Sequence, residues 1–210
     1  MGKTKIEWAM AVFNPVTGCS KISEGCKNCY AERMHTRLEH IKGSGYDDGK
    51  PHFSIRLHPE RLEEPLRWKK PQKVFVCSMG DIFHNDVPFA FVDKVLDVVD
   101  RCPQHTFMIL TKRPKYMKEY FEQIGARENL WLGVTAENQQ AADERIPLLL
   151  QIPAAKRFIS IEPMVGPVSL GGFDGKTFRP WLETVGRNMA NDPIGIDWVI
   201  LGGETGPKAR

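Results

Sequence analysis

Short apolar runs rich in β-branched and aromatic residues alternate along this chain with segments of helical periodicity. Five such runs end in a polar or glycine-rich turn, and several are apolar almost throughout, as expected of strands buried on both faces of a parallel sheet. They occupy residues 74–78, 106–111, 130–135, 157–162 and 197–202. Alternating strands and helices indicate an α/β protein.

The segments between these runs carry the signals of helix boundaries. Residues 89–101 place Val92, Val95, Leu96 and Val99 on one stripe. Residues 114–125 begin with a proline and end with a glycine, as helices often do. Residues 137–145 predict a third helix, after which Pro147 is expected to begin a new turn.

An extended segment at 8–13 adds a sixth strand. We therefore expect an open (β/α)6 partial TIM-like barrel of mostly parallel strands, with ligands at the carboxyl ends of the strands. A doubly wound open sheet would give much the same pattern. The chain is expected to form one domain, 1–210, with irregular insertions at approximately 42–71 and 166–195, where glycine and proline are frequent.

Composition is that of a globular protein, with 41% hydrophobic and 26% charged residues. The formal net charge of +3 permits a nucleic-acid partner but does not require one. No apolar run is long enough to span a bilayer, and the start lacks the apolar region of a signal peptide. These features predict a cytoplasmic protein without membrane association, in which thiols stay reduced.

Three of the five cysteines lie in one loop before an expected helix that starts near Cys29. Cys19, Cys26 and Cys29 form a C-x6-C-x2-C array, and a glycine precedes each of the first two. The C-x2-C spacing commonly brings two thiolates to one metal centre. In a reducing compartment, such a loop is better interpreted as a metal site than as a disulfide.

Three interpretations of this loop compete. Three thiolates can hold a 4Fe–4S cluster that leaves one iron open, or a structural zinc ion can take His35 or His40 as its fourth ligand. The cysteines can also be small core residues, although their glycine, lysine and asparagine neighbours argue against burial. The spacing favours the cluster, with zinc as the alternative, because structural zinc sites usually combine two close ligand pairs. Cys77 and Cys102 are expected to be buried.

The order of a cysteine loop, a helix and successive strand–helix units resembles that of radical S-adenosylmethionine (SAM) enzymes. More closely, five motifs resemble a phage-associated, largely uncharacterised family of radical-SAM-like proteins. They are NPVTGCSKISEGCKNCYAERM, SMGDIFH, LTKRP, ADERIPLLLQIPAAKRFISIEPMVGPV and DWVILGGETGPKAR. The resemblance covers nearly the whole chain and implies a family without an established substrate.

Two features depart from this resemblance. The usual loop of the superfamily is C-x3-C-x2-C, so the longer loop here weakens the transfer of mechanism. Relatives continue past the glycine-rich motif with another helix and strand, which implies that a chain ending at Arg210 is a shortened form.

The resemblance implies a 4Fe–4S cluster, SAM and an electron donor. One electron from the reduced cluster would cleave SAM to methionine and a 5′-deoxyadenosyl radical, which would attack an unidentified substrate. Nucleic acid or a nucleotide is the expected substrate class. The turn Ser78–Met79–Gly80–Asp81 follows the second strand, where superfamily members hold the methionine amino group, so Asp81 is the candidate for this role. As the plain structural alternative, it caps a helix or turn.

Further candidate ligands of SAM follow the later strands. Thr135 and Glu137 are candidates for the ribose, and Lys112 and Arg113 are suited to a carboxylate or phosphate. As plain structural alternatives, Glu137 favours a helix N-terminus, and Lys112 and Arg113 are solvated surface charges. His84 is expected to line the mouth or to cap a turn. The remaining candidates are Thr111, Glu162, Gly202, Gly203 and Glu204.

A radical-SAM-like enzyme is thus the first functional hypothesis. The alternative is a zinc-stabilised protein that binds nucleic acid or another partner and performs no radical chemistry. The segments Trp68–Lys69–Lys70 and Lys112–Arg113–Pro114–Lys115–Tyr116 put basic groups beside aromatic rings, a modest signal for phosphate binding and base stacking.

Overall fold

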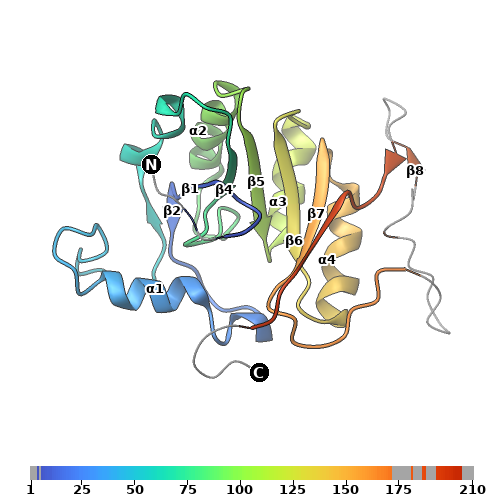
Figure 1. Ribbon diagram of the computed structural model, residues 1–210, viewed down its shortest axis with the longest axis horizontal. Helices are drawn as coiled ribbons and strands as arrows, with labels where there is room; N and C mark the ends of the chain where they lie inside the picture. The colour runs from blue at the N-terminus through green and yellow to red at the C-terminus, as the bar shows by residue number, and fades with distance from the viewer. Residues whose placement is uncertain (1–3, 5, 172–180, 182–185, 188–192, 205–210) are drawn as a thin grey trace.

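Six parallel strands form the central sheet of the computed structural model, which describes residues 4, 6–171, 181, 186–187 and 193–204 (Figure 1). The strands lie side by side in chain order, and each is hydrogen-bonded in parallel to the next. They are β1 (Ala11–Phe13), β4 (Lys73–Val76), β5 (Thr106–Thr111), β6 (Leu130–Thr135), β7 (Lys156–Ile161) and β10 (Trp198–Leu201).

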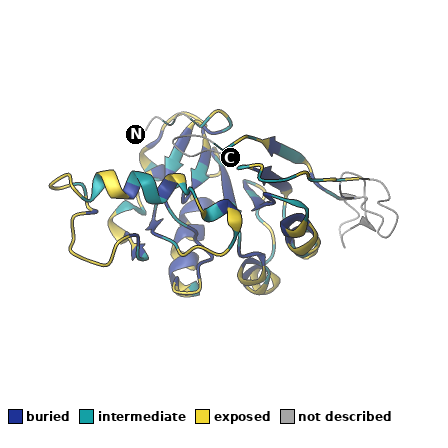
Figure 2. Ribbon diagram, turned by 90° about the horizontal axis from the view of Figure 1, so that it is seen from below, coloured by how far each residue is buried: buried dark blue, intermediate teal, exposed yellow. Residues whose placement is uncertain are grey.

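Three helices cover one face of this sheet, side by side, as Figure 2 shows from the carboxyl ends of the strands. They are α2 (Phe89–Asp100), α3 (Pro114–Ile124) and α4 (Gln139–Gln151), whereas α1 (Tyr30–Leu38) lies across the carboxyl end of the sheet. A doubly wound sheet reverses its strand order and carries helices on both faces. The observed order therefore confirms the expected open, singly wound α/β sheet.

Short elements connect these layers. β2 (Val16–Thr17) pairs antiparallel with β3 (Arg56–Leu57), and the turn η1 (Glu24–Cys26) lies within the cysteine loop. The expected insertion at 42–71 contains β3 and two further 3-10 turns, η2 (Pro59–Arg61) and η3 (Pro65–Arg67). Much of 166–195 lies outside the described residues, apart from short stretches that include the antiparallel pair β8 (Gly186–Arg187) and β9 (Pro193–Ile194). None of the described helices has the length and apolar character that crossing a bilayer requires.

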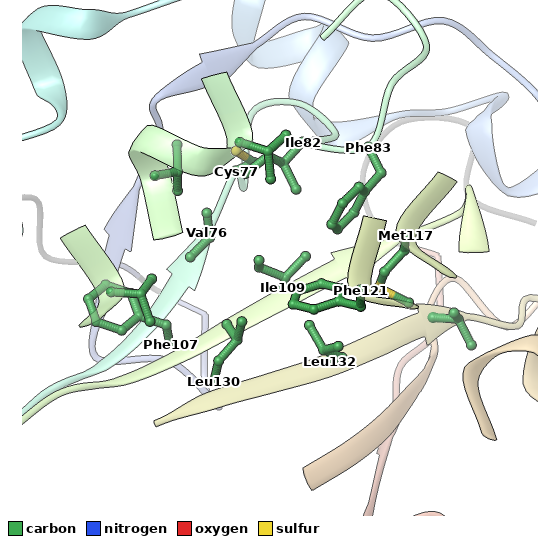
Figure 3. Close-up of a cluster of buried hydrophobic side chains, with 14 of the residues drawn as sticks. Val76, Cys77, Ile82, Phe83, Phe107, Ile109, Met117, Phe121, Leu130 and Leu132 are labelled. Carbon is green, nitrogen blue, oxygen red and sulfur yellow. The ribbon is translucent and has the colours of Figure 1, made fainter. Parts of the chain in front are cut away.

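The main hydrophobic core lies between the sheet and its three helices. Figure 3 shows side chains of β4, β5 and β6 packed against residues of α3 and of the turn after β4, with Phe107, Ile109 and Phe121 fully buried. Cys77 and Cys102 are both buried in this core, as the sequence predicted.

The opposite, uncovered face of the sheet carries a smaller apolar cluster. Phe158 is fully buried there because its ring lies over Gly133, where an added Cβ would come within 2.6 Å of Phe158 Cζ. The Trp8 ring packs at a tilt against Phe75, with 4.6 Å between ring centroids, and also contacts Phe158 and Trp198. The segment before β1 therefore closes part of this inner face.

One helix boundary differs from the prediction. Pro147 was expected to begin a new turn, but α4 continues through Pro147 to Gln151. Ile146 and Leu149 are completely buried on either side of the proline. This apolar packing outweighs the backbone hydrogen bond that a proline inside a helix removes.

Candidate functional site

The cysteine loop runs past the carboxyl ends of the strands, where the segment after β10 ends beside it (Figure 1). Cys19, Cys26 and Cys29 are free thiols and are each partly buried. The side-chain amide of Asn28 donates a hydrogen bond to Glu204 Oε2 at 2.9 Å. This bond joins the cysteine loop to the glycine-rich motif at the far end of the sequence.

Two close backbone approaches fix the start of this loop. Gly18 has a φ of +85°, and a Cβ there would lie 2.0 Å from the carbonyl oxygen of Ser54. A Cβ on Gly80 would lie 2.8 Å from Gly18 O, so the turn after β4 packs directly on the loop. The neighbouring Cys19 N–H donates to Phe53 O at 3.0 Å. Glycine is thus required at both positions, because no side chain fits.

Two residues beside these contacts have unusual backbone angles. Phe53 and Cys77 both have positive φ, 52° and 62°, which is uncommon for side chains of their size. Phe53 presents its carbonyl to Cys19, and Cys77 presents its carbonyl to Gly80. Backbone strain of this kind gathers at functional sites, where surrounding contacts maintain it.

Arg113 connects the turn after β4 to the cysteine loop. Its Nη1 donates to Asp81 Oδ2 at 3.1 Å and to Cys19 Sγ at 3.4 Å. Its Nη2 donates to the backbone and side-chain oxygens of Ser20 at 3.0 and 2.9 Å. Asp81 also accepts the Thr111 hydroxyl at 2.8 Å, and all three strand-end residues are buried. The Asp81 carboxylate therefore serves mainly to hold Arg113 and Thr111 in place.

A histidine completes the contacts of Ser20. His84 Nδ1 accepts the backbone N–H of Asp86 at 3.1 Å, so its Nε2 carries the proton and donates to Ser20 Oγ at 2.7 Å. Burial and the nearby Arg113 lower the pKa of His84, in keeping with a neutral ring. His84 thus holds the cysteine loop in place through its hydrogen bond to Ser20.

The spacing of the three sulfurs can be compared with that of thiolates around a single zinc ion. Zinc bonds of about 2.3 Å to sulfur place tetrahedral thiolates roughly 4 Å apart. Cys19, Cys26 and Cys29 do not form a group within 4.8 Å among the described residues, so at least one pair of sulfurs is farther apart. At least one pair of these sulfurs is thus farther apart than thiolates around one tetrahedral zinc ion.

The histidines expected as a fourth zinc ligand lie elsewhere. His35 belongs to a group with Glu39 and His52, and that group contains no cysteine. The His40 side chain is 78% exposed and lies 3.9 Å from Glu39 Oε1. Neither histidine joins the cysteines in a compact ligand set within the described part of the chain.

Lys112 and Arg113, which directly follow β5, act on the thiols of the cysteine loop. Burial and Asp81 raise the pKa of Cys19 to about 11, although Arg113 opposes this rise. Burial would also raise the pKa of Cys26, but Lys112 and hydrogen bonds from the loop outweigh it and lower that pKa overall. Lys112 thus favours the thiolate of Cys26, whereas Arg113 only partly offsets the effect of burial on Cys19.

Glu137 joins the loop to β6 and α4. Its carboxylate is completely buried and accepts Arg145 Nη1 at 2.8 Å. A Cβ on Gly25 would lie 3.1 Å from the Glu137 side chain, so the turn that carries Cys26 packs on it. Burial would raise the pKa of Glu137, but Ser23 and Arg145 hold it below its usual value. Glu137, predicted to bind the ribose of SAM, thus lies against the cysteine loop, and its carboxylate is paired with Arg145.

The remaining predicted residues lie around the inner face and its rim. Thr135 is buried, and its carbonyl accepts Arg145 Nη1 at 2.7 Å. Glu162 lies beside Gly202, and the residue as a whole is exposed. Partial desolvation of its carboxylate and the nearby Glu7 raise its pKa, although Lys112 opposes this rise. Gly203 has open space around it. Lys112 is partly exposed, so this lysine and Glu162 present opposite charges at the rim.

Sequence reasoning did not select two residues that the structure brings to this site. Asn14 Oδ1 accepts the Ser78 hydroxyl at 3.1 Å and the Met79 N–H at 3.2 Å, and Ser20 receives Arg113 and His84. Asn14 directly follows β1, so the strand-end argument used for the later strands would have identified it. Ser20 carries no comparable signal, because the partners of its side chain are 64 or more positions away.

Comparison with known proteins defines the family. Residues 3–210 match a family described as proteins of unknown function (DUF5131), and the chain therefore belongs to that family. No curated protein matches it.

Two solved structures share the fold. One is a double mutant of spore photoproduct lyase with bound AdoMet and dinucleoside spore photoproduct, at 12% identity and a TM-score of 0.54. It aligns with 77% of this chain and 48% of its own length. The other is a cysteine-to-serine mutant of spore photoproduct lyase, at 14% identity, a TM-score of 0.52, and coverages of 83% and 49%. The chain spans about half the length of these structures, and at this identity the likeness concerns the fold.

Proposed function

We propose that this chain is a radical-SAM-type protein in which Cys19, Cys26 and Cys29 hold a 4Fe–4S cluster. The observation that carries the proposal is a loop with three free thiols, not all within 4.8 Å of one another, at the carboxyl ends of six parallel strands. A structure with the same fold binds AdoMet, which supports SAM as the second ligand. Neither His35 nor His40, the expected fourth zinc ligands, groups with these cysteines among the described residues.

When bound and reduced, such a cluster supplies the electron that cleaves SAM to methionine and a 5′-deoxyadenosyl radical. The residues of this chain would position the cysteine thiolates and SAM. Arg113 and Ser20 orient the Cys19 thiolate, and Glu137 supports the turn that carries Cys26. Lys112 and Glu162 offer a cation and an anion at the rim, suited to the carboxylate and amino groups of SAM. Trp8 and Phe158 exclude water from the inner face below.

A SAM cleavage assay tests this function. The anaerobically reconstituted protein, reduced with dithionite, should release 5′-deoxyadenosine from SAM. Replacing Cys19, Cys26 and Cys29 by alanine should reduce the release to background, while Cys102→Ala, which removes a thiol from the core, should retain it. Release from the triple variant at the wild-type rate would refute the proposal.

We propose nucleic acid as the substrate class, because a basic groove leads to the site. The groove has a volume of about 680 Å³ and is lined by Arg61, Arg67, Lys69 and Lys70, against one acidic residue, Glu64. Asn14 also lines it and holds the turn at Ser78 and Met79. A substrate bound along the lysines would therefore reach the carboxyl ends of the strands at Asn14.

Salt dependence of binding tests this substrate class. Each phosphate contact contributes about 0.7 to 0.9 to the slope of log affinity against log salt. Lys69→Ala with Lys70→Ala should reduce this slope by roughly 1.4 to 1.8 for an oligonucleotide. The matched control is Lys42→Ala with Lys94→Ala, two exposed lysines that do not line the groove. An equal loss in both double variants would show nonspecific attraction and contradict the groove. Cluster assembly is expected to be unchanged in either variant.

A further inference from the structure

A second group of metal-ligand side chains lies at the far end of α1 from the cysteine loop. His35 and Glu39 are one helical turn apart, in the last turn of α1 and at its C-cap. His52 comes from the loop between α1 and β3. The ligand atoms of these three residues all lie within 4.8 Å of one another.

The buried member of this group lacks a hydrogen-bond partner. His35 is fully buried, and neither of its ring nitrogens makes a hydrogen bond. The rings of Tyr46 and Phe53 pack edge-on against it at centroid distances of 5.3 and 5.5 Å. Buried imidazole nitrogens are normally paired, so an unpaired ring aimed at a carboxylate and a second histidine indicates an absent ligand.

The nearby charges are engaged with one another. Arg56 donates to both carboxylate oxygens of Asp48 at 2.9 Å, so this arginine is already paired. His40, the next residue after Glu39, projects outward with 78% of its side chain exposed. The His52 side chain is 45% exposed, which gives an ion a path to the group.

We propose that His35, Glu39 and His52 bind a divalent transition-metal ion, for which zinc is the best match. Two imidazoles and one carboxylate are a common zinc ligand set, with water in the fourth position. Zinc bonds of about 2.0 to 2.2 Å place neighbouring ligand atoms roughly 3.3 Å apart. Glu39 Oε2 lies 2.8 Å from His52 Nδ1 and 3.4 Å from His35 Nδ1, which brackets this spacing.

The bound ion would fasten the loop after α1 to the helix. His52 immediately precedes Phe53, whose carbonyl accepts the N–H of Cys19. The ion therefore stabilises the strained segment that supports the first cysteine. Its three ligands are separate from the cysteines, so this site does not depend on the proposed cluster.

Zinc binding to the full chain tests the site. Zinc affinity is measured by competition with a chelator in the protein with Cys19, Cys26 and Cys29 replaced by serine, which removes the thiol ligands. One Zn²⁺ per chain is expected, and His52→Ala should weaken it by at least roughly 100-fold, because even outer-shell changes cost 10- to 100-fold. His40→Ala is the matched control and should leave the affinity unchanged.

A second measurement keeps the test valid if the serine background folds poorly. Co²⁺ bound to the unaltered protein should give a spectrum of nitrogen and oxygen ligation without a thiolate charge-transfer band at the first equivalent. The spectrum should disappear in His52→Ala. Equal zinc loss in the His52 and His40 variants, or thiolate bands at the first equivalent of Co²⁺, would overturn the proposal.

Discussion

Arg113 contacts three segments that are far apart in the sequence. One guanidinium holds Asp81 after β4, Cys19 of the cysteine loop and the backbone of Ser20. The planar fork of arginine suits this task, whereas a lysine ammonium cannot reach all three at once. At the scale of single residues, the site therefore depends on the buried Arg113–Asp81 ion pair, whose guanidinium also donates to the Cys19 thiol.

Removing this guanidinium should destabilise the fold and the metal site together. Arg113→Gln leaves Asp81 as an unpaired buried carboxylate, so the free energy of unfolding should fall by about 3–5 kcal/mol. Chemical denaturation measures this loss, and iron content after reconstitution should fall as well. Lys115→Gln, an exposed neighbour on α3, should change the unfolding free energy by less than about 0.5 kcal/mol.

Adding Asp81→Asn to Arg113→Gln identifies the cause of the loss. The double variant removes the unpaired charge and should recover part of the stability, while Cys19 remains without its arginine. A single variant as stable as the wild type would show that the Asp81–Arg113 pair does not hold the turn.

At the scale of elements, α4 and the cysteine turn η1 are joined through one carboxylate. Glu137 precedes α4, pairs with Arg145 inside that helix and packs against Gly25 of η1. This contact links a helix on the covered face of the sheet to the loop at its carboxyl edge.

Acid should weaken this connection in a defined pH range. The folded-state pKa of Glu137 lies below its ordinary value of 4.5, so the pair adds stability that is present above pH 4.5 and is lost as the pH falls below it. Glu137→Gln should lower the unfolding free energy at pH 7 by about 3–5 kcal/mol, since it leaves Arg145 unpaired. It should also flatten the acid dependence of stability between pH 4.5 and 3. Glu144→Gln, exposed on α4, should keep the wild-type dependence. An unchanged acid slope in Glu137→Gln would contradict this assignment.

Most strands and helices were predictable because their apolar periodicity is local information. The expected strands at 106–111 and 130–135 coincide with β5 and β6. The passage of α4 through Pro147 was not predictable, because it depends on burial of Ile146 and Leu149 against other elements. Similarly, the strand-end rule placed Asp81 and Arg113 in one site but gave no sign that they pair with each other and with Cys19.

At the scale of the whole molecule, the open sheet has one face covered by helices and one face that carries an aromatic cluster. The strand order excludes a doubly wound sheet, which the sequence pattern alone had left open. The carboxyl edge gathers the cysteine loop and the glycine-rich motif, and the basic groove reaches this edge at Asn14. A cofactor bound at the cysteine loop, as proposed, would lie at this edge.

The most direct test of the central claim is the iron and acid-labile sulfide content of the anaerobically reconstituted chain. The account predicts about four of each per chain, and an electron paramagnetic resonance signal of the reduced protein that changes when SAM is added. One iron or less per chain, or a full cluster whose signal ignores SAM, would contradict a three-cysteine centre with an open iron.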